Sequence, residues 1–327
     1  MEELWKTKKT NGALISFHLK KKKIRLSSYP SCLVIDITDF CNLNCPFCPN
    51  KRISHREKKE NTLMASKDFK KIIDMLGAYL TEIVFGDKWE PVLNRDIYDM
   101  LLYSKKHKIR TVLSTNFSGL TEGDIRNMIT SGLDYINVSI DGATQESYSK
   151  YRIGGDLNTV LDNLRLLIKL KKELKLKNPV IEWQYLVFKH NQAEIAKARE
   201  IAIDMNVDRI SFVPANIYDF EKNYKEWLPT IEEYAKYKII DEQEDVKWVY
   251  MDKKDNCYAP WHTLAINADG DIFPCCGEER TGYEWGNIFN MDFNEIWNSK
   301  NYIELRKYLL FRKAAGGHIP CKKCLNI

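Results

Sequence analysis

Short apolar segments alternate with longer amphipathic segments between Ser31 and about Ala215. The short segments are rich in Val, Ile and Leu, which is typical of strands buried on both faces of a sheet. The longer segments repeat apolar residues at helical spacing, which predicts amphipathic helices. The predicted strands are Cys32–Thr38, Glu82–Phe85, Ile109–Ser114, Tyr135–Ile140, Val180–Val187 and Arg209–Val213, and the predicted helices are Lys67–Leu80, Arg95–His107, Glu122–Ser131, Leu157–Lys175 and Ala193–Met205.

This alternation predicts the fold class. Six strands that alternate with helices indicate right-handed βαβ units and a parallel sheet, so we predict an α/β fold. Ligands bind such sheets at the carboxyl ends of the strands. Polar residues that directly follow a predicted strand are therefore candidate site residues.

The pattern changes after Pro214, where a polar and aromatic stretch contains a predicted helix around Ile231–Ile240. Further on, Thr263–Asn267 and Asp271–Pro274 flank the dipeptide Asp269-Gly270. This arrangement predicts a hairpin, because Asp-Gly accepts the positive φ of a tight turn.

These changes divide the chain into three predicted parts. Residues 1–30 form an N-terminal extension, and residues 31–215 form the α/β domain. Residues 216–327 supply linker helices and a small, cysteine-rich α+β domain, which includes a predicted helix at Asn294–Phe311.

Composition and charge exclude several classes of protein. The chain has 327 residues and a formal net charge of +5, and its basic residues occur in local runs. Nucleic-acid binders concentrate more positive charge on one face, so no nucleic-acid partner is predicted. No stretch approaches the ~20 apolar residues that a membrane helix needs, and no signal-peptide pattern is visible. We therefore predict a cytoplasmic protein with no membrane partner.

Most of the nine cysteines fall into two sets. Disulfides are rare in a reducing compartment, so clustered cysteines indicate metal ligands or catalytic thiols. Cys41, Cys45 and Cys48 follow the first predicted strand on one short loop, where three thiolates can bind one iron–sulfur cluster. A [4Fe–4S] cube with three ligands keeps one iron open, as metal centres that bind substrate do. A zinc site with a fourth ligand from elsewhere is the alternative.

The second set lies near the C-terminus. The predicted hairpin brings Cys257 and Cys275 together, and Cys321 and Cys324 add two more thiols. Four thiolates close a site with no open position, as in a [4Fe–4S] or a zinc centre. Cys276 exceeds this count, and its alternative roles are an inert thiol, a substitute ligand or a hydrogen-atom donor.

The CxxxCxxC loop, with Phe47 before its third cysteine, resembles the signature of the radical S-adenosylmethionine (SAM) superfamily. The resemblance implies a partial (β/α)6 barrel and a [4Fe–4S] cluster that binds SAM. Trp89 replaces the second glycine of the turn Gly-Gly-Glu-Pro that the family often uses near SAM. The residues that the resemblance implies for SAM binding are Phe47, Glu90, Thr115, Asn116, Ser139 and Arg152, the last two at the ribose and the methionine carboxylate.

The C-terminal motifs are similar to those of a SPASM/twitch domain. This similarity implies one auxiliary [4Fe–4S] cluster, with Cys257, Cys275, Cys321 and Cys324 as ligands. The motifs that carry it are Pro260-Trp261, Asp269-Gly270, Pro274-Cys275-Cys276, Ile296-Trp297-Asn298 and the terminal CxxC.

The resemblance also implies an activity. A family member cleaves SAM reductively to a 5′-deoxyadenosyl radical, which removes a hydrogen atom from a C–H bond of its substrate. We expect a small polar substrate, such as a sugar or an aminocyclitol, or a peptide, with epimerisation or dehydrogenation as the outcome. In an epimerisation, Cys276 would return the hydrogen atom. A flavodoxin- or ferredoxin-type donor would supply the electron. The alternatives are a radical SAM enzyme that modifies ribosomal peptides and a non-catalytic iron–sulfur or zinc electron-transfer protein.

Overall fold

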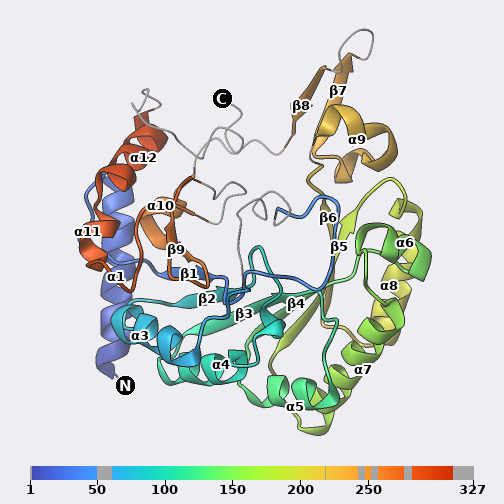
Figure 1. Ribbon diagram of the computed structural model, residues 1–327, viewed down its shortest axis with the longest axis horizontal. Helices are drawn as coiled ribbons and strands as arrows, with labels where there is room; N and C mark the ends of the chain where they lie inside the picture. The colour runs from blue at the N-terminus through green and yellow to red at the C-terminus, as the bar shows by residue number, and fades with distance from the viewer. Residues whose placement is uncertain are drawn as a thin grey trace. The chain divides into compact units, whose positions relative to one another are not determined.

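The computed structural model describes residues 2–49, 61–217, 219–241, 247–251, 257–275 and 282–311. These residues form an α/β fold with an eight-stranded sheet in the order β10-β9-β1-β2-β3-β4-β5-β6 and a separate two-stranded sheet of β7 and β8 (Figure 1). The large sheet is mostly parallel, which confirms the predicted fold class.

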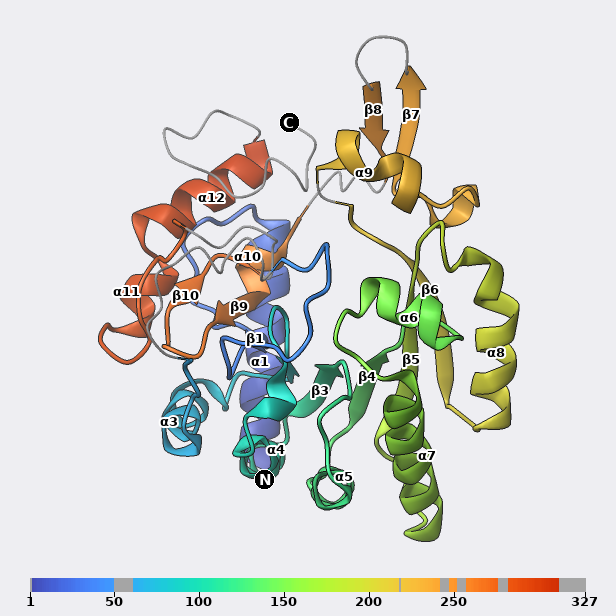
Figure 2. The same cartoon turned by 45° about the vertical axis from the view of Figure 1, so that its right-hand side comes forward.

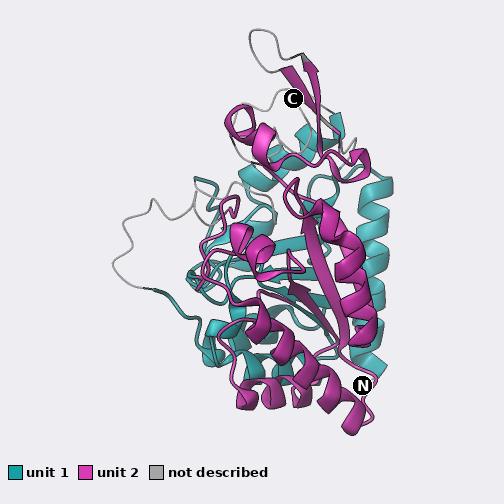
Figure 3. Ribbon diagram, turned by 90° about the vertical axis from the view of Figure 1, so that its right-hand side faces the viewer, with its two compact units in different colours: residues 1–40, 53–113, 254–327 teal, residues 41–52, 114–253 magenta. Residues whose placement is uncertain are grey.

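The chain divides into two compact units, which Figure 3 colours separately. Unit 1 comprises residues 1–40, 53–113 and 254–327, and unit 2 comprises residues 41–52 and 114–253. The three-part division predicted above remains a prediction.

In unit 1, strand β1 (Cys32–Ile35) lies between two parallel neighbours that are distant in sequence. It pairs with β2 (Glu82–Phe85) on one side and with β9 (Thr263–Ile266) on the other. Strand β2 pairs in parallel with the first four residues of β3 (Arg110–Thr115), and β10 (Ile272–Phe273) is antiparallel to β9. This central position explains why the sequence of β1 is apolar throughout, because both of its faces are covered.

The remaining elements of unit 1 surround these strands in Figure 1. They are the helices α1 (Glu2–Lys20), α3 (Ser66–Leu76), α4 (Ile97–Lys106), α10 (Ala259–His262), α11 (Phe293–Trp297) and α12 (Lys300–Phe311), with the 3-10 turn η1 (Pro91–Leu93).

Helix α1 lies in the part of the chain for which the sequence predicted only an extension. Lys8 fixes it, because its buried ammonium group donates hydrogen bonds to the carbonyl oxygens of Leu80, His107 and Lys108. Burial, and then the charge of Lys108, lower the pKa of Lys8 to about 8. A single lysine thus joins α1 to the ends of two other segments of unit 1.

In unit 2, strands β4 (Tyr135–Ser139), β5 (Val180–Val187) and β6 (Arg209–Pro214) pair in parallel. Helix α5 (Glu122–Thr130) packs on α7 (Leu157–Glu173), and α8 (Ile195–Asp204) packs on β6. The other elements are α6 (Gln145–Tyr151), η2 (Gln192–Glu194), α9 (Phe220–Trp227), η3 (Glu232–Tyr234), β7 (Tyr237–Asp241) and β8 (Lys247–Tyr250), and Figure 2 shows α9 beside the β7–β8 pair.

The helix predicted around Ile231–Ile240 is wrong. The structure has the short turn η3 there, followed by strand β7, which pairs with β8. Tyr237 is buried and Ile239 packs inward, whereas Ile240 is exposed. This inside–outside alternation has the period of a strand, and packing by Tyr237 and Ile239 outweighs the helical propensity of the preceding residues.

The single helix predicted at Asn294–Phe311 is two helices, α11 and α12. Asn298 ends α11, and its side chain accepts a hydrogen bond from the backbone N–H of Leu26 at 2.8 Å and donates one to the Leu26 carbonyl oxygen at 2.9 Å. The helix is interrupted because this side chain pairs with a distant backbone group. The predicted hairpin is confirmed as β9 and β10, and Gly270 adopts a φ of +87° in its turn.

Candidate functional site

The loop that carries Cys41, Cys45 and Cys48 belongs to unit 2, and its apolar side chains are anchored in an aromatic cluster. The ring of Phe47 is buried and meets the ring of Trp227 edge-on, with 5.0 Å between centroids. The rings of Tyr151 and Phe188 also pack against Phe47 in this cluster. Burial of Phe47 therefore fixes the middle of the loop between its second and third cysteines.

The sulfur of Cys41 accepts hydrogen bonds from two N–H groups. One donor is the backbone N–H of Leu43, at 3.4 Å, and the other is Nδ2 of Asn116, at 3.6 Å. The same Asn116 amide donates to Oδ1 of Asn42 at 2.9 Å, and its Oδ1 accepts from the hydroxyl of Ser118 at 2.7 Å. Asn116 is thus oriented from both ends, with its N–H groups toward the loop.

The turn that presents Asn116 is strained. Phe117 has a φ of +58°, in the left-handed region that bulky residues rarely adopt. Its backbone N–H donates to Oγ1 of Thr115 at 2.9 Å, and the ring of Phe117 is fully buried. Strain of this kind persists where the surroundings determine it, and it is common at functional sites.

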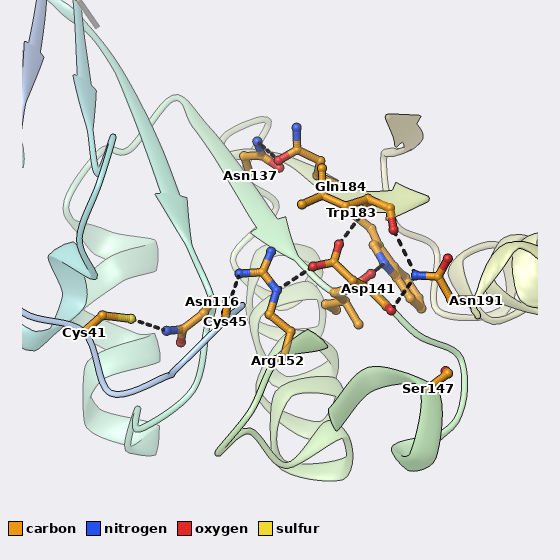
Figure 4. A network of polar contacts seen from close by, with 12 residues as sticks. Cys41, Cys45, Asn116, Asn137, Asp141, Ser147, Arg152, Trp183, Gln184 and Asn191 are labelled. Atoms are coloured by element: carbon orange, nitrogen blue, oxygen red, sulfur yellow. Dashed lines mark hydrogen bonds and ion pairs between the residues drawn. The ribbon is translucent and has the colours of Figure 1, made fainter. Parts of the chain in front are cut away.

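The sulfur of Cys45 faces a cation. Nη1 of Arg152 lies 3.8 Å from this sulfur, and Nε of Arg152 lies 2.5 Å from Oδ2 of Asp141 (Figure 4). Burial raises the pKa of the Cys45 thiol, and the charge of Arg152 opposes this rise. Burial alone would lower the pKa of Arg152, but the charges of Asp141 and Cys45 raise it well above its usual value.

Local backbone geometry delivers Arg152 to this position. Arg152 is the C-cap of α6, and Asp141 and Gly142 follow β4. A Cβ atom at Gly142 would lie 2.4 Å from the backbone nitrogen of Tyr148, so only glycine lets the chain pass this closely to α6.

These contacts are suited to iron–sulfur ligation. N–H donors directed at cysteine sulfurs stabilise the thiolate form, which is the form that binds iron. The structure brings such donors to Cys41 and Cys45, so the loop fits a cluster. No three His, Cys, Asp or Glu side chains within the described ranges are grouped closely enough to bind a single metal ion, so the fit to a cluster rests on these donors and on the spacing of the three cysteines.

The other predicted SAM-binding residues lie at strand or turn ends. Ser139 is the last residue of β4, and Thr115 is the last residue of β3. The hydroxyl oxygen of Thr115 accepts the hydrogen bond from the backbone N–H of Phe117. Glu90, in unit 1, is buried at the start of η1, and its carboxylate accepts a hydrogen bond from the backbone N–H of Val92 at 3.3 Å.

Two of the predicted auxiliary ligands lie in the described part of unit 1. Cys257 precedes α10, and Cys275 follows β10 by two residues; both side chains are partly exposed. Cys276, Cys321 and Cys324 lie outside the described residues, so their predicted roles stay predictions.

Asp141 and Asn191 are functional candidates that the sequence analysis did not select. Asp141 stands in the segment Ser139-Ile140-Asp141-Gly142, directly after a predicted strand, so a signal for it was present. Asn191 follows β5 by four residues and had no such signal.

Unit 2 also contains a cavity of about 650 Å³ beside the end of β6. Its lining combines apolar side chains with charged ones, among them Glu232 and Lys236. Leu228, Tyr237 and Ile239 line it and also pack against the aromatic cluster around Phe47. The cavity therefore borders the same extended apolar cluster to which Phe47 belongs.

Comparison with known proteins identifies the class. A profile of the radical SAM superfamily matches residues 35–181, and a profile of the SPASM iron–sulfur cluster-binding domain matches residues 257–325. The chain therefore carries a radical SAM domain and a SPASM domain. Its cofactors are those that these domains bind, namely SAM, a [4Fe–4S] cluster and an auxiliary iron–sulfur cluster.

Relatives with known activities are distant. The chain is 24% identical over 320 residues to the AdoMet-dependent heme synthase of Methanosarcina barkeri, with 86% of each chain covered. It is 25% identical over 300 residues to a tungsten-containing aldehyde ferredoxin oxidoreductase cofactor-modifying protein of Pyrococcus furiosus, with 84% of this chain and 82% of the relative covered.

Among solved structures, Streptococcus suis SuiB bound to S-adenosylmethionine has a similar fold. The TM-score is 0.64 at 17% identity, covering 90% of this chain and 72% of SuiB. The structure of anSMEcpe with bound AdoMet matches with a TM-score of 0.58 at 17% identity, covering 90% and 86% of the two chains.

None of the described helices of this chain is long and apolar enough to span a membrane.

Proposed function

We propose that this chain is a radical SAM enzyme whose catalytic cluster is bound by Cys41, Cys45 and Cys48. The observation that carries the proposal is the set of N–H donors at two of these sulfurs, from Leu43 and Asn116 to Cys41 and from Arg152 to Cys45. Three cysteine ligands leave one iron of a four-iron cube open, and an open position is what a metal centre needs to bind a substrate.

When bound, the cofactors would supply the bond-breaking chemistry: one electron from the cluster would split SAM into methionine and a 5′-deoxyadenosyl radical, and the radical would remove a hydrogen atom from the substrate. The protein positions these groups and excludes competing reactions. Phe47 and Trp227 do part of this work, since their buried rings keep water away from one side of the cysteine loop.

SAM itself is assigned to Phe47, Glu90, Thr115, Asn116, Ser139 and Arg152, as the family resemblance implies. A guanidinium group carries five N–H donors. The Arg152 contacts with Asp141 and Cys45 use only part of this capacity, so the side chain retains donors for the SAM carboxylate.

The auxiliary cluster is assigned to Cys257, Cys275, Cys321 and Cys324, with a flavodoxin- or ferredoxin-type protein as the electron donor. The substrate is a small polar molecule or a peptide. The SuiB fold has been solved with a precursor peptide bound, and the BtrN fold, with a TM-score of 0.51, has been solved with 2-DOIA. Both ligands belong to those proteins. They show that proteins of this fold bind peptides as well as small molecules, so we propose both substrate classes for this chain.

Iron analysis tests the two sets of ligands. Anaerobic reconstitution should yield about eight irons per chain, the sum of two four-iron cubes. Replacement of Cys41, Cys45 and Cys48 by Ala should remove about half of this iron and abolish SAM cleavage. Cys32→Ala is the matched control, because Cys32 lies within strand β1 and should affect neither quantity. Retained iron with SAM cleavage in the triple variant would refute the catalytic assignment, and stoichiometric zinc would refute the auxiliary one.

The reaction type depends on Cys276. If this thiol returns a hydrogen atom to the substrate radical, turnover in heavy water should place one deuterium at an inverted carbon. Cys276→Ala should lose this product while SAM cleavage persists. An oxidised product made equally by the wild type and by Cys276→Ala would assign the chain to the dehydrogenases instead.

A further inference from the structure

Arg152 connects Cys45, in the loop that carries Cys41, Cys45 and Cys48, to the buried carboxylate of Asp141. Its Nη1 is within hydrogen-bond distance of the Cys45 sulfur, at 3.8 Å, and its Nε is 2.5 Å from Oδ2 of Asp141. Figure 4 shows the guanidinium group between the two partners. Asp141 is fully buried, and the Arg152 side chain is only 14% exposed. The interaction is therefore weakly screened by water.

Asp141 is itself held by the strand and turn that follow it in the fold. Its Oδ1 accepts a hydrogen bond from the backbone N–H of Leu186 at 2.6 Å, and its carbonyl oxygen accepts one from Nδ2 of Asn191 at 2.9 Å. Asn191 is fully buried, and its Oδ1 accepts from the backbone N–H of Phe188 at 2.7 Å. The carboxylate thus has a fixed place, and it orients the guanidinium group that faces Cys45.

A donor at this sulfur affects the electron affinity of a cluster. Reduction adds negative charge that is shared by the cysteine sulfurs, and hydrogen bonds to these sulfurs stabilise it. The positive charge of Arg152 acts in the same direction. The buried charge of Asp141 acts in the opposite direction, but its carboxylate contacts Nε of Arg152, whereas Nη1 of Arg152 contacts the Cys45 sulfur itself at 3.8 Å. The positive charge is therefore the one that acts directly on this ligand.

We propose that Arg152 is a positioning residue that donates to Cys45 and raises the reduction potential of the catalytic cluster, and that Asp141 acts by orienting Arg152. The proposal rests on the proposed ligation of that cluster by Cys45. It assigns Arg152 a role that is separate from SAM binding and that is present before SAM binds.

The test is a potentiometric titration of the reconstituted full-length protein without SAM, followed by electron paramagnetic resonance. The signal of the catalytic cluster is the one absent from the variant with Ala at Cys41, Cys45 and Cys48. At the wild-type midpoint, Arg152→Met should lower the ratio of reduced to oxidised catalytic cluster at least ten-fold. Such a change corresponds to about 59 mV for a one-electron couple.

Three further variants sharpen the result. Lys150→Gln removes an equal charge from the same helix, where Lys150 pairs with Glu226 at 3.1 Å, and should leave the ratio within two-fold. Arg152→Lys keeps the charge but not the planar fork, so its ratio should lie between those of the wild type and Arg152→Met. The double variant Arg152→Met with Asp141→Asn removes both charges, and its ratio should also lie between them.

An unchanged ratio in Arg152→Met with normal iron content would overturn the proposal, even if SAM binding weakened. If Arg152→Met does not retain its cluster, the double variant is used instead. A ratio of reduced to oxidised cluster equal to that of the wild type in the double variant would also overturn the proposal. Failure of the proposed ligation would look different, because Cys45→Ala would then retain the catalytic signal.

Discussion

Arg152 in unit 2 and Arg306 in unit 1 are both largely buried and both lie over aromatic rings, but their polar partners differ. Arg152 stacks on Tyr151 and contacts the carboxylate of Asp141 and the sulfur of Cys45. Arg306 lies over Trp297 and Tyr302, and its guanidinium group donates hydrogen bonds to backbone carbonyl oxygens, those of Pro260, Ile24 and Trp297.

The difference appears in the pKa of each guanidinium group. Asp141 and Cys45 raise the pKa of Arg152 well above its usual value, whereas burial lowers the pKa of Arg306 to about 9. Backbone carbonyl oxygens accept hydrogen bonds from the N–H groups of Arg306, but they carry no net charge and so do not neutralise the guanidinium group. Arg306 therefore braces the segments around it, while Arg152 belongs to a network of charges that reaches a candidate metal ligand.

The largest effect is expected for Arg152→Met. It leaves the carboxylate of Asp141 buried without a counter-charge, which typically costs about 3–5 kcal/mol of unfolding free energy. Asp141→Asn in the same chain should recover part of this loss, because no unpaired charge remains. Urea unfolding of cluster-loaded protein measures both values. Equal stability of the single and double variants would show that the pair does not behave as a charge pair.

Arg306→Met should cost less, about 2–3 kcal/mol, because hydrogen bonds from a charged group to carbonyls are lost while the aromatic packing is partly kept. Arg306→Lys should recover part of this loss. No partner substitution can rescue Arg306→Met, since its partners are backbone groups. Complete rescue of stability by a change at a nearby carboxylate would contradict this distinction between the two arginines.

The sequence could predict the fold class and the cysteine loop, but not the surroundings of the loop. Strand and helix periodicities are local, and the six strands of the α/β region appear where they were predicted. The pairing of Asn298 with Leu26, by contrast, joins residues far apart in the chain and interrupts a helix that local pattern predicts as continuous. Local pattern also missed the strand at Tyr237–Asp241, because its inward side chains pack on residues elsewhere in the chain.

In the candidate site, too, the local features could be predicted from the sequence and the contacts between distant residues could not. The spacing of Cys41, Cys45 and Cys48 is a local signal, and the resemblance it carries indicated Arg152 as well. The contact between Arg152 and Cys45 could not be predicted, because it depends on where Asp141 and Asn191 hold the guanidinium group after folding.

The smallest effect is expected for Lys8, whose partners are also carbonyl oxygens but whose ammonium group can lose its proton. Its pKa is about 8 in the folded protein and about 10.4 in an unfolded chain. Between these values the unfolded state binds more protons, so the unfolding free energy should rise with pH, by at most about 1.4 kcal/mol per pH unit. Lys8→Met should remove this slope between pH 8 and 10, and the exposed neighbour Lys9, changed to Met, should retain it. Equal slopes in wild type and Lys8→Met would mean that the carbonyl oxygens keep Lys8 protonated and that it braces α1 as a permanent cation.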